Sequence, residues 1–195
     1  MKKVMTVAAI LLFTLTSFAQ EETLFGDKYI EHGGFGGPAV KFTSINNEFG
    51  VLVGGRGGWV INHTLVIGGG GYGLVNEVDM GLNEFGEDQY LNFGYGGFEM
   101  EYVINSDELM HFTFQALIGA GGVSLRTGDF EDFGDNVDSF FITEPGVGLE
   151  LNVLSYLRIH VGGSYRIVNG VKSFGLKDSD LSGPSASFTM KFGKF

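Results

Sequence analysis

The sequence has no cysteine, only three prolines and, beyond its first 20 residues, no long apolar run. Without cysteine there are no disulfides and no lipoprotein attachment site, so the fold must be stabilised by its own backbone pairing. A membrane-spanning helix needs about 18 or more consecutive apolar residues, which excludes a helical span for the mature chain. The length of 195 residues favours a single domain.

Basic residues are also scarce, with 12 Lys and Arg against 23 Asp and Glu. Phosphate binding needs a basic face, so this charge argues against nucleic acid as a partner. No Gly-Lys-Ser/Thr follows the glycines at 68–73, which argues against a phosphate-binding loop. Because no other cofactor motif is present, we expect no cofactor.

The first 19 residues have the three parts of a secretory signal peptide. Lys2 and Lys3 supply the positive charge, residues 4–18 the apolar stretch, and Ser17-Phe18-Ala19 a small-x-small cleavage site. A retained N-terminal anchor is the alternative. Cleavage after Ala19 removes two of the 12 basic residues and no acid, which leaves 10 against 23 and a net charge of −13.

Glycine and phenylalanine are plentiful instead, with 33 and 19 residues. Doubled glycines such as Gly54-Gly55 and Gly162-Gly163 are typical of the strongly bent strands of a narrow barrel. From Gly34 onward, polar turns separate eight apolar segments, each long enough to cross a membrane as a tilted strand. These segments are 34–44, 49–61, 64–75, 90–104, 111–125, 140–153, 156–168 and 185–195.

Period-two alternation within the segments predicts strands with one apolar and one polar face. In 156–168, Leu157 and Ile159 alternate with Arg158 and His160, and segments 111–125 and 140–153 repeat the pattern. We expect the apolar faces to contact lipid, with Phe114, Leu149 and Ile159 as test positions.

The segment 90–104 changes parity between Tyr95 and Phe98. A single change of parity within a strand indicates one extra residue, so we expect a β-bulge at Gly96-Gly97.

The connections between segments alternate in length. Three are short (62–63, 105–110 and 154–155) and three are long (76–89, 126–139 and 169–184), while the first, 45–48, is short. Short turns at one end and long loops at the other are the outer-membrane pattern, with both termini on the periplasmic side. The sequence thus predicts an all-β chain: a transmembrane antiparallel up-and-down β-barrel of about eight strands at 34–195, after a signal peptide at 1–19 and an N-terminal periplasmic segment at 20–33.

The last residues, Ser187-Phe188-Thr189-Met190-Lys191-Phe192-Gly193-Lys194-Phe195, resemble the closing strand of outer-membrane barrels. With the signal peptide and segment 156–168, the chain resembles the small eight-stranded outer-membrane proteins, the size class of the OmpA and OmpX barrel domains. The resemblance implies that the barrel assembly machinery reads Phe195, although Phe195 lies one residue out of step with Phe188 and Phe192. It also implies an outer-membrane location among membrane lipids.

The polar faces would bring both signs of charge into the barrel. An eight-stranded barrel has just enough interior for side chains to fill it, so we expect these charges to pair and plug the lumen, with Arg158 and Arg166 bound to glutamates. A gated ion or proton path is the alternative. The expected network is Lys41, Arg56, Glu99, Glu101, Glu144, Glu150, Arg158, Arg166 and Lys191.

The four histidines, His32, His63, His111 and His160, have no Ser or acid partner at a spacing that would place a nucleophile beside a base. We therefore expect no enzymatic activity.

Two of the long connections are acidic, and Phe85, Phe130 and Phe133 lie among the acids. The first holds Glu77, Asp79, Glu84, Glu87 and Asp88, and no Lys or Arg occurs between residues 76 and 125. Carboxylates are the ligands that hard cations prefer, so we expect weak divalent-cation binding in the second, although no regular calcium-loop spacing is present. Its candidate ligands are Asp129, Glu131, Asp132, Asp135 and Asp138. A solvated surface without a ligand is the alternative.

The leading hypothesis is a non-enzymatic outer-membrane barrel with a structural or interaction role in the cell envelope. A narrow, porin-like channel is one alternative. A soluble periplasmic barrel of the lipocalin type, with its apolar faces around a ligand, is the other.

Overall fold

The computed structural model describes residues 30–127 and 136–195. The signal peptide, most of the 20–33 segment and the acids Asp129, Glu131, Asp132 and Asp135 lie outside these ranges. Within the described residues, no helix is long and apolar enough to cross a membrane.

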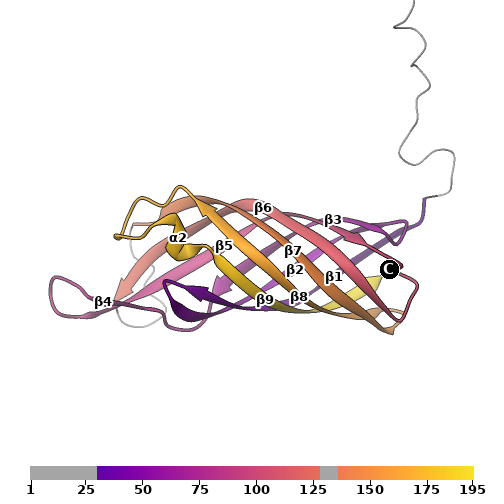
Figure 1. Cartoon of the computed structure of the whole chain (residues 1–195), viewed down its shortest axis with the longest axis horizontal. Coiled ribbons are helices and arrows are strands. Elements are labelled where there is room, and N and C mark those ends of the chain that lie inside the picture. The colour runs from indigo at the N-terminus through magenta and orange to yellow at the C-terminus, as the bar shows by residue number, and fades with distance from the viewer. Residues whose placement is uncertain (1–29, 128–135) are drawn as a thin grey trace, which may run out of the picture. The chain divides into compact units, whose positions relative to one another are not determined.

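Eight antiparallel strands of the described chain close into one barrel, as the sequence predicts (Figure 1). Each strand pairs with the next along the chain, β3 pairs with β5 across a long connection, and β9 closes the barrel by pairing with β1. The strand ends lie within two residues of those expected. The eight strands are β1 (His32–Ile45), β2 (Glu48–Ile61), β3 (Leu65–Leu74), β5 (Asp88–Val103), β6 (Met110–Thr127), β7 (Asp138–Leu154), β8 (Leu157–Asn169) and β9 (Gly183–Lys194).

The two ends of the barrel differ in their connections. One end, called here the turn end, carries the short β2–β3, β5–β6 and β7–β8 connections together with the C-terminus. The other, called the long-loop end, carries the β3–β5, β6–β7 and β8–β9 connections. Two short elements that the sequence does not predict lie there: β4 (Asp79–Leu82), which pairs with the start of β5, and α2 (Asp178–Leu181) (Figure 1).

The tightest turns use residues that tolerate the left-handed region. Asn46 and Asn47 join β1 to β2 with φ of 51° and 65°, and Asn62 and His63 follow β2 with φ of 50° and 57°. Two consecutive residues with positive φ suit the right-handed twist of a tight hairpin, and the short side chain of Asn accepts this conformation readily.

The alternation in β5 is continuous, so the expected β-bulge is wrong. Gly96 and Gly97 pair in unbroken register with β3 on one side and with β6 on the other. Tyr95 points into the barrel and is 5% exposed, whereas Phe98 points outward and is 48% exposed. The Tyr95 hydroxyl donates to the buried Glu144 at 2.7 Å. An aromatic ring with a polar tip thus occupies the polar face without any change of parity.

The outer face of the barrel is apolar along all eight strands. Phe114 and Leu149 are 52% and 40% exposed there, and Ile159 lies on the same face of β8. All three test positions therefore point away from the lumen.

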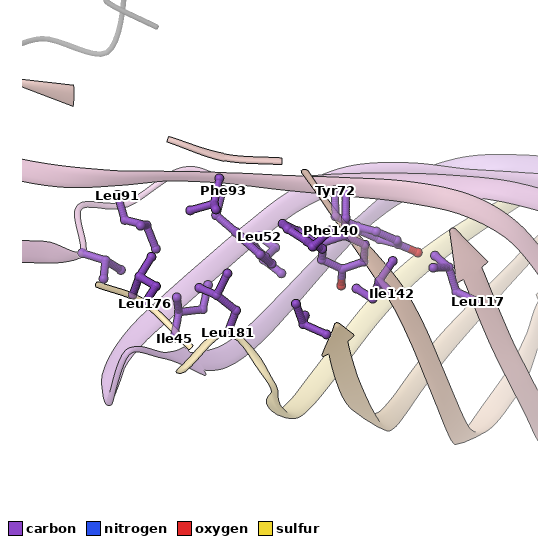
Figure 2. Close-up of a cluster of buried hydrophobic side chains, with 14 of the residues drawn as sticks. Ile45, Leu52, Tyr72, Leu91, Phe93, Leu117, Phe140, Ile142, Leu176 and Leu181 are labelled. Atoms are coloured by element: carbon purple, nitrogen blue, oxygen red, sulfur yellow. The ribbon is translucent and has the colours of Figure 1, made fainter. Parts of the chain in front are cut away.

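The lumen has an apolar cluster at each end, which the sequence pattern does not predict. At the long-loop end, buried strand residues such as Ile45, Leu91 and Phe140 pack with Leu176 and Leu181 from the β8–β9 connection (Figure 2). At the turn end, a smaller cluster contains Phe35, Val60, Val66 and Val103, with Phe195 packed against it. The charged residues lie in the part of the lumen between these two clusters.

Candidate functional site: the barrel interior

All nine residues of the expected charge network point into the barrel and are buried. Each occupies an inward position of its strand, where the outward neighbours are glycine, proline or apolar residues in most cases. The nine residues are Lys41, Arg56, Glu99, Glu101, Glu144, Glu150, Arg158, Arg166 and Lys191.

Glu144 on β7 is the centre of one group of contacts. The ammonium of Lys41 donates to both of its carboxylate oxygens at 2.9 Å, and the Ser164 hydroxyl donates to Oε1 at 2.5 Å. Tyr95 supplies a further donor to Oε2. The Lys41 ammonium also lies 3.6 Å from the ring centroid of Tyr72. The carboxylate is thus surrounded by donors from β1, β5 and β8.

A second group connects Glu99, Glu101 and Glu150. Arg56 spans the first two, with Nε 2.7 Å from Glu99 and Nη2 2.9 Å from Glu101. Lys191 spans the last two, lying 2.5 Å from Glu101 and also binding Glu150. Arg158 donates to Glu150 at 3.1 Å. Five strands, β2, β5, β7, β8 and β9, are linked across the lumen through charges of opposite sign.

Arg166 does not bind a glutamate, contrary to expectation. Its Nε donates to the carbonyl of Leu181 at 2.6 Å and its Nη2 to the carbonyl of Ser44 at 3.1 Å. The guanidinium lies 5.0 Å from the ring centroid of Phe93. Arg166 lies across from Glu144 in the β7–β8 register, but Glu144 already accepts from Lys41, Tyr95 and Ser164. The Arg166 guanidinium instead donates to backbone carbonyls of the β8–β9 connection and of β1.

Neutral side chains that the sequence pattern does not single out complete the network. The Tyr72 hydroxyl donates to Glu99 at 2.8 Å, and Gln115 accepts from Arg56 Nη1 at 2.6 Å. The signal that could have found Tyr72 and Tyr95 was their inward parity in β3 and β5. That signal is weak for tyrosine, which is equally typical of a lipid-facing aromatic belt.

The charged groups leave little free space between them. The cavity among Lys41, Arg56, Glu99 and Glu144 measures about 10 Å³, and a single water molecule needs roughly 10–15 Å³ of such space. At the turn end, an open recess of about 730 Å³ reaches Arg158 and Phe195. Arg158 is the one residue of the charge network among those that line this recess.

Phe195 follows β9 and points inward. Its ring stacks on Phe35 with centroids 6.1 Å apart, and the Arg158 guanidinium lies 4.2 Å from its centroid. Phe188 and Phe192 point outward and are 39% and 43% exposed. The terminal aromatic is therefore out of step with them because it belongs to the inner face and covers the turn end of the lumen.

The histidines show no catalytic arrangement in the described residues. His160 lies 3.2 Å from the Thr113 hydroxyl, but these two side chains are 0% and 1% exposed, so no substrate reaches them. His63 pairs with Glu31 at 2.6 Å in a turn, and His32 stacks on Trp59.

Of the candidate cation ligands, only Asp138 is described. Its Oδ2 accepts the backbone N–H groups of Lys172 and Ser173 at 2.6 and 2.8 Å, so it fastens the β8–β9 connection to β7. No group of three or more metal-ligating side chains occurs in residues 30–127 or 136–195.

Comparison with protein-family models and with curated protein sequences gives no match. Two solved structures share the fold. Neisserial surface protein A superposes with a TM-score of 0.57 at 14% identity, covering 86% of this chain and 100% of that one. The N-terminal β-barrel domain of Pseudomonas aeruginosa OprF superposes with a TM-score of 0.52 at 10% identity, covering 83% and 96%. The fold is that of the small eight-stranded outer-membrane barrels.

Proposed function

We propose that this protein resides in the outer membrane as a sealed, non-enzymatic barrel with a structural or interaction role in the envelope. The observation that carries the proposal is the interior: paired charges with about 10 Å³ of free space, between two apolar clusters. A barrel filled in this way has no room for a substrate or a stream of ions. What remains for interaction is its surface.

The two faces of the barrel support a membrane location. A soluble barrel of the lipocalin type places apolar side chains around its ligand, whereas here the middle of the lumen is charged. The outer face carries large apolar side chains such as Trp59, Phe112 and Val161, which are 49%, 62% and 56% exposed. A closed barrel also leaves no unpaired strand edge for lipid to meet. In this orientation the turn end faces the periplasm and the long-loop end faces outward.

The partners proposed for such a barrel are membrane lipids along its outer face and the assembly machinery, which would read Phe195. Weak binding of divalent cations to Asp129, Glu131, Asp132, Asp135 and Asp138 is also proposed. Calorimetric titration of calcium into the refolded barrel tests it against a variant with Asn and Gln at these five positions. Equal heats from the two proteins would reduce the acids to a solvated surface.

Fractionation combined with gel electrophoresis tests the main proposal. We expect the protein in the outer-membrane fraction, with different mobilities for unheated and heated samples because an intact barrel resists unfolding in detergent at room temperature. A protein that fractionates with soluble periplasmic proteins would contradict the membrane location.

A further inference from the structure

A hairpin formed by β4 and the start of β5 extends from the long-loop end of the barrel (Figure 1). Its base is fixed. Val78 is fully buried in the apolar cluster of that end, and its carbonyl accepts the Leu91 N–H at 3.0 Å. The Asp79 N–H donates to the Glu48 carboxylate at 3.0 Å. The hairpin is thus attached to the rim of the barrel through both its core and its polar contacts.

The tip of this hairpin is ordered by one side chain. Asn83 Oδ1 accepts the N–H groups of Phe85 and Glu87, both at 2.9 Å, and its Nδ2 donates to the Glu87 carboxylate at 2.9 Å. The Asn83 N–H donates to the Glu87 carbonyl at 2.9 Å, and Gly86 supplies the left-handed φ of 80° that the turn requires. Because these bonds fix the backbone, they also fix the direction of the Phe85 Cα–Cβ bond.

This ordered tip holds large apolar side chains in solvent. Phe85 is 87% exposed and Leu82 is 66% exposed. Single exposed apolar residues are common on protein surfaces, but two on one small, internally bonded turn form a contact surface whose ordering cost is already met before binding.

The charge around the two apolar residues has one sign. Asp79, Glu84, Glu87 and Asp88 are exposed on the hairpin, and the chain has no Lys or Arg from 76 to 125. The next cation, Arg126, is 2% exposed and lies 3.4 Å from Glu77. A partner that approaches Phe85 therefore meets only negative charge on the hairpin itself.

We propose that this hairpin is a docking element for a basic protein surface with an apolar pocket. Phe85 and Leu82 enter the pocket, and the four acids face Lys and Arg on its rim. Phosphate-bearing lipid headgroups do not fit, because the same acids repel them. The proposal deepens the interaction role proposed above and depends on the long-loop end lying outside the membrane.

A random peptide library displayed on phage, selected against the full chain in lipid nanodiscs, tests the proposal. We expect the recovered peptides to be rich in Lys and Arg and to carry at least one large apolar residue. Phe85→Ser should weaken their binding by about tenfold or more, as for a central apolar anchor. Asn83→Ala should weaken it less, since Phe85 remains but its position is no longer fixed. Binding should also fall as salt is raised.

Leu109→Ser is the matched control, because Leu109 is 70% exposed in a turn at the opposite end of the barrel. It should leave peptide binding unchanged. Recovery of no peptide above background, or peptides without basic residues, would overturn the proposal, as would equal binding by wild type and Phe85→Ser. Binding through Phe85 to vesicles containing lipopolysaccharide in place of peptides would equally overturn it. All these outcomes leave the gel test of the membrane barrel unaffected, so the two proposals fail separately.

Discussion

Single buried charges decide how the middle of the lumen holds together. Lys191 is 1% exposed and is the one side chain in the described network that contacts both Glu101 and Glu150. These glutamates keep other donors, since Arg56 also reaches Glu101 and Arg158 also reaches Glu150. Lys191 therefore connects two partial networks into one.

Replacing Lys191 with Met should lower the free energy of unfolding by about 3–5 kcal/mol, because two buried carboxylates each lose a cation. Arg158→Ala should cost less, since it takes a donor from Glu150 alone. Urea unfolding in lipid vesicles measures both. Adding Glu101→Gln to Lys191→Met should restore part of the loss, and a double variant no more stable than Lys191→Met would speak against the pairing.

At positions that face outward, introducing a charge should destabilise the barrel. Arg at Phe114 or Leu149 should reduce stability by about 2–4 kcal/mol if the side chain lies near the membrane midplane. Arg at Phe85, which is exposed at the hairpin tip, should leave stability almost unchanged. The same urea titrations measure these values, and equal effects at all three positions would reject the lipid-facing orientation.

The elements of the chain differ in how far the sequence predicts them. The eight long strands were predicted from apolar segments separated by polar turns, and alternation over ten or more residues in 111–125, 140–153 and 156–168 is a strong local signal. β4 and α2 have only four residues each, too few for a periodic pattern, and they form through contacts with the barrel rim. Period-two alternation also tells which face of the strand a residue occupies, but not where that residue lies along the barrel axis. Ile142 and Glu144 share the inner face of β7, yet one packs in the apolar cluster and the other in the charge network.

The β8–β9 connection offers a test at this scale. Arg166 holds its Leu181 carbonyl, and Asp138 holds the N–H groups of Lys172 and Ser173. We expect Arg166→Met to speed tryptic cleavage after Lys177, an exposed residue of this connection, while the barrel keeps its heat-dependent gel mobility. Cleavage after Lys194, at the far end of β9, should not change. A wild-type rate after Lys177 would show that Arg166 does not fasten the connection.

At the scale of the whole molecule, the lumen is closed in three successive layers. These layers are the apolar cluster of the long-loop end, the charge network with its cavity of about 10 Å³, and the small cluster around Phe35, where the open recess of the turn end reaches Arg158. The sequence indicated only the middle layer, because the outer layers draw on residues such as Leu181 and Phe195 that reach the lumen from outside the paired strands.

We expect the purified barrel to give no steady unitary conductance in planar bilayers. Porin-like steps would require an aqueous path that the three layers do not leave. The same preparation must first show the heat-dependent mobility shift in the gel. An absence of conductance then indicates a closed barrel and not an unfolded protein. Regular steps of constant size would favour the channel alternative.

If the assembly machinery reads Phe195 as proposed, the inward position of this residue sets an order of events during assembly. Phe35, on which it stacks, belongs to β1, and β1 meets β9 only when the barrel closes. Under the proposed function, a factor that recognises the terminal aromatic would do so on the open sheet, because closure places the ring on Phe35. Barrel closure and release from the assembly machinery would then be one step, and a chain unable to close would stay bound to the factor that delivered it.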